Sequence, residues 1–333
     1  MDPQKSAKRA IEAVGLKPTI KRSILEARLL GERLQFTFQS RPAPSDALLL
    51  AGPGRSGTTW LANVLSSVSG TQQIFEPLLF NPDVYELANW EPPSTSKYLR
   101  LHYLRPEANH PRWNDLLRRV LTGQYRTYET DLHRTSIFPK RYLIKEIRAN
   151  LMLGYIYDHF RSQILYVTRH PCAVVASRMR LKWQVNLDEL LNQDELIDDY
   201  LLPWVGEIER SKHDPVASHA IWWAVESMVA ARELFTRPHY WLNYEDLLLA
   251  PTETLQGIFQ WLGLEREAVP EKVLEQNSHT TWRESDHDRT QEIHNRLTSW
   301  KTRLSERDQN LILSWGDRLG VPAGYSEAIK IAE

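Results

Sequence analysis

Residues 47–61 constrain the fold of this chain more than any other stretch, because they join a strand pattern, a glycine turn and a helix start. The apolar run at 47–51 has the length and composition of a buried strand. Gly52 and Gly54 break that run, and a helical pattern of apolar residues follows Gly57. A strand, a glycine turn and a helix N-terminus in series point backbone N–H groups at an anion. The stretch therefore predicts a phosphate-binding loop in an α/β fold.

The loop lacks the lysine with which P-loop enzymes bind nucleoside triphosphates. Gly52, Gly57 and the Thr58–Thr59 pair fit part of that pattern, but the pattern requires Lys where Thr58 stands. The cation lies earlier, at Arg55, so the loop is not built for a triphosphate bound with Mg²⁺. A P-loop nucleotide kinase stays the alternative function, and it would need that metal. The residues expected at the anion are Arg55, Ser56, Gly57, Thr58, Thr59 and Trp60.

The composition is that of an ordinary globular protein, and it limits the classes of partner that we expect. A net charge of −1 over 333 residues gives no reason to expect a nucleic-acid partner, because such a surface would be strongly basic. No apolar run reaches the roughly 18 residues of a membrane-spanning helix, so we expect no span. The single cysteine, Cys172, excludes an internal disulfide and suits a reducing compartment. We therefore expect a cytoplasmic protein, and the histidines show no spacing typical of a metal site.

Strand and helix patterns alternate from residue 46 to 262, which predicts an α/β fold of three layers with a mostly parallel sheet covered by helices on both faces. We expect a basic helical leader at 1–45 and one domain at 46–333. An aromatic-rich insertion at 80–135 would shape an acceptor pocket, and the acidic, aliphatic segment at 181–204 would form a lid. The strands are expected at 47–51, 72–77, 141–147, 163–168 and 239–247.

A second anion site is predicted where the fourth strand ends. Arg169 follows that strand, and Ser177 lies about two turns along the helix that begins near Pro171. A guanidinium at a strand end and a hydroxyl on the next helix can hold one phosphate from two sides. The sequence therefore predicts two anion sites, one in the loop and one at Arg169.

Three segments in this order resemble the sulfotransferases that use 3′-phosphoadenosine 5′-phosphosulfate. The segment 53–61 (PGRSGTTWL) is similar to the loop that binds the 5′-phosphosulfate, and 165–178 (LYVTRHPCAVVASR) is similar to the 3′-phosphate segment. The strand end and helix at 240–251 (YWLNYEDLLLAP), which include Tyr244, also resemble the family. The position of Arg55 is commonly occupied by Arg in the carbohydrate and tyrosyl-protein types of this family, whereas the cytosolic branch has Lys there. His170 departs from the Asp of many members.

The resemblance implies sulfuryl transfer from that donor, without a metal, to a hydroxyl or amine on a small-molecule or glycan acceptor. By analogy with phosphoryl transfer, positioning and electrostatic stabilisation should supply most of the catalysis. Arg55 would neutralise the charge that develops on the leaving 5′-phosphate, with Thr58 and Thr59 as hydrogen-bond donors. Arg169 and Ser177 would hold the 3′-phosphate, and Tyr244 would belong to the same nucleotide site.

Two carboxylates compete for the role of general base, which needs a pKa raised toward neutrality. Glu76 lies in the segment 75–77 (FEP), which resembles carbohydrate sulfotransferases. Glu146 is the alternative, in the strand that carries a catalytic His in the cytosolic branch. Alignment on Lys145 puts that His at Ile147, so it is missing here. We therefore prefer Glu76.

The C-terminal part leaves several points open. The segment 299–305 (SWKTRLS) resembles the family's Trp-Lys/Arg segment that folds over the nucleotide, and three arginines upstream are candidate ligands: Arg283, Arg289 and Arg296. The identity of the acceptor and the oligomeric state do not follow from the sequence. A pseudoenzyme or nucleotide-gated binding module is a third possibility, and it would be favoured if Arg55 pointed away from the loop.

Overall fold

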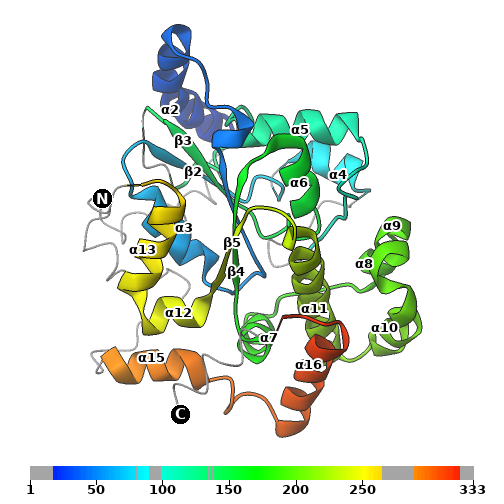
Figure 1. Cartoon of the computed structure of the whole chain (residues 1–333). Coiled ribbons are helices and arrows are strands. Elements are labelled where there is room, and N and C mark those ends of the chain that lie inside the picture. Colours follow the sequence, from blue (N-terminus) through cyan, green and yellow to red (C-terminus); the bar gives the residue numbers. More distant parts are fainter. Residues whose placement is uncertain are drawn as a thin grey trace.

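A five-stranded parallel sheet forms the centre of the protein (Figure 1). The computed structural model describes residues 18–79, 81–89, 99–133, 136, 138–264 and 289–322. The strands run in the order β2-β3-β1-β4-β5, and all four pairings are parallel. The predicted α/β fold with a parallel sheet inside a shell of helices is thus confirmed. The strand bounds are β1 Leu48–Ala51, β2 Thr71–Phe75, β3 Arg141–Lys145, β4 Gln163–Thr168 and β5 Tyr240–Asn243.

Helices and short helical segments make up most of the rest of the described chain. In chain order, the α-helices are α2 Pro18–Phe38, α3 Thr58–Ser66, α4 Pro82–Leu87, α5 Pro111–Leu121, α6 Leu153–Phe160, α7 Pro171–Arg180, α8 Asp188–Leu191, α9 Asp194–Leu196, α10 Val205–Ser211, α11 Pro215–Leu234, α12 Tyr244–Leu249, α13 Pro251–Trp261, α15 Arg289–Thr298 and α16 Glu306–Arg318. Shorter 3₁₀ or π turns are found at Pro44–Asp46, Ile197–Leu201 and Leu202–Trp204.

The two faces of the sheet contribute to separate apolar clusters, as side-chain alternation along β1 requires. Leu48 and Leu50 pack with side chains of α3 and α13. Leu49 and Ala51 point the other way and pack with side chains of α5 and α6. All four side chains are buried, so β1 is covered on both faces, as expected for the middle strand of a parallel sheet. Figure 1 shows the helices of the two layers on opposite sides of the sheet.

A third apolar cluster joins helices α7, α11 and α16. Trp222 and Trp223 of α11 are completely buried there, and α11 lies against both α7 and α16. This cluster holds α7, the helix that carries Ser177, in place, and it therefore stabilises the predicted second anion site.

The described part of the predicted leader consists mainly of helix α2, which contacts the rest of the chain through polar groups. Lys21 forms an ion pair with Glu129 at 2.8 Å, and Glu32 accepts a hydrogen bond from the Tyr142 hydroxyl at 3.1 Å. The remaining leader residues, 1–17, lie outside the described part. Within the described chain, no helix has the length and apolar character needed to cross a membrane.

Candidate active site

The candidate site lies at the carboxyl edge of the sheet, where open α/β sheets bind their ligands. Because all five strands are parallel, the residue that follows each strand lies at this same edge. These five residues are Gly52, Glu76, Glu146, Arg169 and Tyr244. The topology therefore brings residues from distant parts of the chain to the edge from which the predicted phosphate loop starts.

The loop between β1 and α3 has the properties of an anion cradle. The first N–H groups of α3 have no carbonyl partner within the helix. The Ser56 hydroxyl is buried and finds no hydrogen-bond partner among the described residues. Burial, together with the nearby positive charges of Arg169 and Arg180, lowers the pKa of Arg55 to about 10. Positive potential is thus concentrated in the loop, and the residues present fit a bound phosphate or sulfate group.

The backbone of the loop is shaped for close approach. Gly57 has φ +83°, and a Cβ at this position would collide with the ring of Tyr244. A Cβ at Gly54 would collide with the ring of Trp183 in the same way. Arg55 itself has φ +86°, a left-handed conformation that costs a side-chain-bearing residue about 1–3 kcal/mol. The structure therefore holds Arg55 in a conformation that an unconstrained chain would avoid.

The residues of the two predicted anion sites lie together. Arg55 Nε donates to Ser177 Oγ at 3.1 Å, and Arg169 Nη1 donates to the Arg55 carbonyl at 3.1 Å. The Arg169 guanidinium lies 4.4 Å from the centroid of the Tyr244 ring, and its Nη2 donates to the Arg296 carbonyl at 3.1 Å. The arrangement therefore connects the loop, α7, the end of β5 and the C-terminal α15. Arg55 faces Ser177 rather than pointing away, so the condition that would favour a binding module is not met.

The other predicted loop and tail residues are placed less centrally. Thr58 is buried at the start of α3, Thr59 is half-buried, and Trp60 packs against the apolar layer between α3 and α13. Of the C-terminal candidates, Arg283 and the side chain of Arg289 lie outside the described residues. Among the described residues, no three His, Cys, Asp or Glu side chains come together in a way that could hold a metal ion.

A buried network of polar side chains holds the loop in place, and the sequence did not predict this network. The Gly52 N–H donates to Asn150 Oδ1 at 2.9 Å, and Asn150 Nδ2 donates to Glu226 Oε2 at 2.8 Å. Arg178 forms an ion pair with Glu226 at 2.5 Å and donates from Nε to the Gly54 carbonyl at 3.1 Å. Both ends of the glycine turn are therefore tied to one buried ion pair. Only Arg178, which closes the 165–178 motif, stood out in the sequence.

The two candidate bases have different surroundings. Glu76 forms ion pairs with Lys145 and, at 2.7 Å, with Arg148. Glu146 accepts main-chain hydrogen bonds from Leu78 at 2.8 Å and Arg148 at 3.0 Å. Burial raises the pKa of Glu146, whereas at Glu76 the two cations outweigh burial and hold the pKa well below its usual range. The expectation that Glu76 has a raised pKa is therefore wrong for this arrangement, because the sequence did not reveal the two cations.

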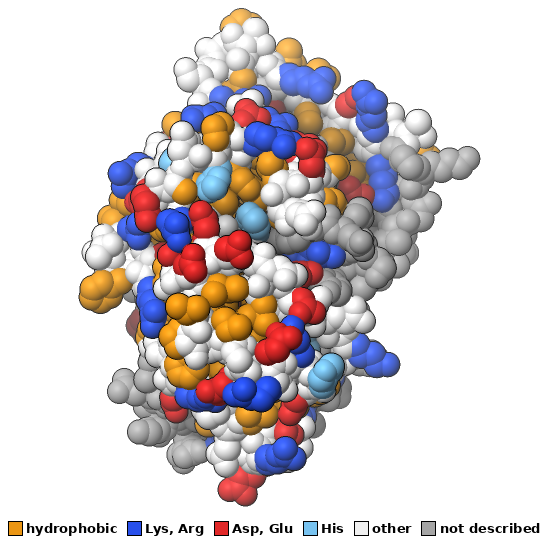
Figure 2. Space-filling model, turned by 90° about the vertical axis from the view of Figure 1, so that its right-hand side faces the viewer, with side chains coloured by type: hydrophobic (Ala, Val, Ile, Leu, Met, Phe, Trp, Pro, Cys, Tyr) orange, Lys and Arg blue, Asp and Glu red, His pale blue; other side chains and the backbone are white. Residues whose placement is uncertain are grey.

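The predicted insertion and the predicted lid meet around a cavity of about 790 Å³. Its lining comes from the end of α4, residues 100–104, the start of α5 and residues 186–195. Figure 2 looks onto this side of the molecule, where acidic side chains gather next to histidines. The cavity thus lies between the insertion that was predicted to shape an acceptor pocket and the segment that was predicted to form a lid.

The chain is similar to a known protein family and to several solved structures. Residues 48–268 match the family model described as "Sulfotransferase family". No curated protein matches the chain. Among solved structures, the sulfotransferase domain from the curacin biosynthetic pathway is 18% identical, with 85% of this chain and 99% of that chain covered and a TM-score of 0.45.

Two further solved structures show similar values. The sulfotransferase domain from the Synechococcus PCC 7002 olefin synthase is 16% identical, with 86% of this chain and 97% of that chain covered and a TM-score of 0.42. Mouse sulfotransferase SULT7A1, complexed with PAP, is 11% identical, with coverages of 91% and 93% and a TM-score of 0.45. At such low identities and TM-scores, we base no further conclusion on these structures.

Proposed function

The chain belongs to the sulfotransferase family, and from that premise we propose that it transfers the sulfuryl group of 3′-phosphoadenosine 5′-phosphosulfate to a hydroxyl or amine acceptor. One observation carries this proposal. Arg55 of the loop donates to Ser177, and Arg169 donates to the Arg55 carbonyl. Two anion-binding positions therefore adjoin, which suits a nucleotide with separate phosphates on its 3′ and 5′ oxygens. The Arg-Ser-Gly-Thr-Thr loop further supports a saccharide or other alcohol as the acceptor.

The described residues fit both ends of this nucleotide. The Ser56 hydroxyl, the first N–H groups of α3 and the Arg55 guanidinium would hold the 5′-phosphosulfate. Arg169 and Ser177 would hold the 3′-phosphate. Tyr244, whose ring lies against both Gly57 and Arg169, would form a wall of the nucleotide site. The bound nucleotide supplies the sulfuryl group, and Arg55 offsets the charge that develops on the 5′-phosphate.

We propose Glu76 as the general base. It is 8% exposed against 1% for Glu146, so an acceptor can reach it more readily, and the cations paired with it, Lys145 and Arg148, could also bind an anion. The acceptor oxygen would form its bond to sulfur while the bond between sulfur and the bridging oxygen breaks, and that electron pair stays on the 5′-phosphate. The acceptor's proton goes to Glu76. An anion bound beside Lys145 and Arg148 would raise the pKa of Glu76 toward the range that a base needs.

Calorimetric titration with adenosine 3′,5′-bisphosphate and with ATP, each with and without Mg²⁺, tests the proposal against a nucleotide kinase. We expect the bisphosphate to bind more tightly by about 10-fold or more without metal, because one charge-assisted contact to the 3′-phosphate contributes about 1.5–3 kcal/mol. Equal affinities, or a strict need for Mg²⁺, would instead support the kinase. Turnover is then read by mass spectrometry as transfer of labelled sulfate to a panel of acceptors.

A further inference from the structure

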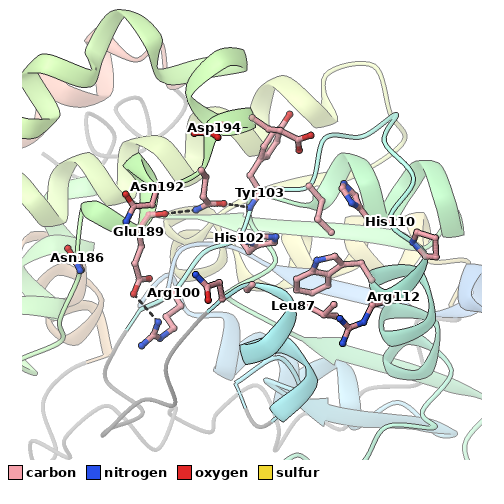
Figure 3. Close-up of a pocket in the computed structure, with 17 residues that line it drawn as sticks. Leu87, Arg100, His102, Tyr103, His110, Arg112, Asn186, Glu189, Asn192 and Asp194 are labelled. Atoms are coloured by element: carbon pink, nitrogen blue, oxygen red, sulfur yellow. Dashed lines mark hydrogen bonds and ion pairs between the residues drawn. The ribbon is translucent and has the colours of Figure 1, made fainter.

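The cavity lined by residues of 87–113 and 186–195 has a strongly polar side and a more mixed side (Figure 3). Figure 3 shows Glu189, Arg100 and Asn192 on one side, Leu87 and His110 on the other, and His102 between them. The lining comes from segments far apart in the sequence, 186–195 and 87–113, and Arg100 of the second segment lies on the polar side with Glu189. A cavity of about 790 Å³ is large enough for a ligand of the size of a disaccharide.

Two connections place this cavity next to the proposed reaction centre. Trp183 lies against Gly54 of the loop, and the next residue, Gln184, accepts a hydrogen bond from the Leu99 N–H at 3.0 Å. Leu99 directly precedes Arg100 of the cavity lining. On the other flank, the Tyr85 hydroxyl of α4, the helix that ends at Leu87 of the lining, donates to the Leu79 carbonyl, and the Leu79 N–H donates to the Glu76 carbonyl at 3.1 Å. The cavity lining is therefore connected to the phosphate loop and to the segment that carries Glu76.

The polar side offers hydrogen-bond acceptors directly beside donors. Glu189 Oε1 is paired with Arg100 Nη1 at 3.0 Å, whereas Glu189 Oε2 is buried and finds no hydrogen-bond partner among the described residues. Gln193 is fixed on both sides, since it accepts from the Tyr103 N–H at 2.7 Å and donates to the Leu101 carbonyl at 3.0 Å. A fixed carboxylate–guanidinium pair matches two adjacent hydroxyl groups, because each hydroxyl can both donate and accept.

Two other acceptor classes fit this lining poorly. A phenol or other apolar acceptor would leave Glu189 Oε2 buried without a partner, whereas a hydroxyl group of the acceptor could donate to it. An anionic acceptor would meet the carboxylates of Glu189, Asp194 and Glu195, while both guanidiniums of the lining are already in ion pairs. Those pairs are Arg100–Glu189 and Arg112–Glu86.

We propose that this cavity binds a neutral, hydroxyl-rich acceptor of the saccharide class, and that Glu189 and Arg100 determine this specificity. The inference rests on the proposed function and narrows its acceptor.

The test uses the full chain loaded with adenosine 3′,5′-bisphosphate and titrated with neutral disaccharides (maltose, cellobiose and lactose), methyl glucuronide, methyl glucosaminide and p-cresol. In the bisphosphate-loaded protein we expect saturable binding of a neutral disaccharide in preference to the other three compounds. With 3′-phosphoadenosine 5′-phosphosulfate supplied as the sulfuryl donor, we expect sulfation with the same preference. In Glu189→Gln the acceptor KM should rise about 10- to 100-fold, the effect of losing a hydrogen bond to a charged group. The affinity for the bisphosphate should not change.

Asp188→Asn is the matched control, because Asp188 neighbours Glu189 on α8 but pairs with Lys212 instead of lining the cavity. Asn192→Ala is a second cavity variant on an exposed side chain, so a rise in acceptor KM there does not depend on the folding of Glu189→Gln. Preference for p-cresol, the glucuronide or the amine would overturn the inference, and so would the absence of disaccharide binding to the loaded protein. Failure to bind the bisphosphate at all would instead overturn the proposed function.

Discussion

Arg55 Nε lies 3.1 Å from Ser177 Oγ, so a hydrogen bond joins the phosphate loop to helix α7 across 122 residues of sequence. The interaction matters because each residue was predicted to hold a different phosphate of one nucleotide. A ligand that carries only one of these phosphates can use only part of the pair, which makes the two sites separable by experiment.

Arg169→Ala and Ser177→Ala are expected to weaken the binding of adenosine 3′,5′-bisphosphate. Loss of the charged contact to Arg169 should cost about 1.5–3 kcal/mol, and loss of the Ser177 hydroxyl about 0.5–1.5 kcal/mol. Calorimetry should show these losses for the bisphosphate but not for adenosine 5′-phosphosulfate, which has no 3′-phosphate. Equal losses with both ligands would show that Arg169 and Ser177 do not form the 3′-phosphate site.

Glu76→Gln should reduce kcat by roughly 10²–10⁴-fold, the usual contribution of a general base. Gln keeps the shape of the side chain but removes the charge that pairs with Lys145 and Arg148, so the melting temperature should fall as well. Turnover is therefore measured well below the melting temperature, together with the affinity for adenosine 3′,5′-bisphosphate, which should barely change.

Glu146→Gln is the control for that variant. Glu146 accepts from the Leu78 N–H through Oε2 and from the Arg148 N–H through Oε1, so Gln keeps one of these two bonds and the melting temperature should fall. Turnover is therefore measured well below the melting temperature here as well. We expect nearly unchanged turnover. Loss of activity in Glu146→Gln with an active Glu76→Gln would reverse the two roles.

Gly57→Ala should abolish nucleotide binding, because the new Cβ would meet the Tyr244 ring and because φ at this position is +83°. The matched control is Gly206→Ala in α10, where the nearest atom to an added Cβ is Arg210 Nη1 at 3.6 Å. There the helix should gain about 0.5–1 kcal/mol. Thermal melts and bisphosphate titrations of both variants check the pair. A Gly57→Ala protein that binds the nucleotide normally would contradict the assigned close contact.

Asn150→Ala should loosen the loop without touching the nucleotide. The substitution leaves the buried Gly52 N–H without its acceptor and removes one donor to Glu226, at a cost of about 1–3 kcal/mol. We expect a lower free energy of unfolding together with weaker bisphosphate binding. Asn310→Ala, at an exposed position on α16, is the control. If Asn150→Ala lost stability but kept its full nucleotide affinity, the bracing would be structural only.

Local patterns in the sequence were sufficient to predict the five strands, but the fifth was expected to reach residue 247, and residues 244–249 form helix α12 instead. The apolar run before Gly52 and the glycines after it identified β1, the loop and α3, because strand burial and turn chemistry depend on neighbouring residues. The order of the strands did not follow, since nothing local shows that β3 is inserted between β1 and β2.

The charge environment of the site could not be predicted for the same reason. Lys145 and Arg148 lie 69 and 72 residues from Glu76 in the sequence, and only the pairing of β2 with β3 brings them together. Their positive charges lower the pKa of Glu76, contrary to the expectation from the sequence. The link from Asn150 to Glu226 spans 76 residues and depends on the packing of α11.

The strand order separates the two candidate bases from the residues proposed to bind the nucleotide, because they follow strands in different halves of the sheet. Glu76 and Glu146 follow strands β2 and β3, whereas Arg169 and Tyr244, which we propose as nucleotide-binding residues, follow strands β4 and β5. Strand β1 and the loop that follows it lie between these two pairs of strands. Substitutions near β2 can therefore change the acceptor specificity without altering the residues proposed to bind the nucleotide. With this topology, the acceptor specificity can diverge during evolution while the proposed donor site stays the same.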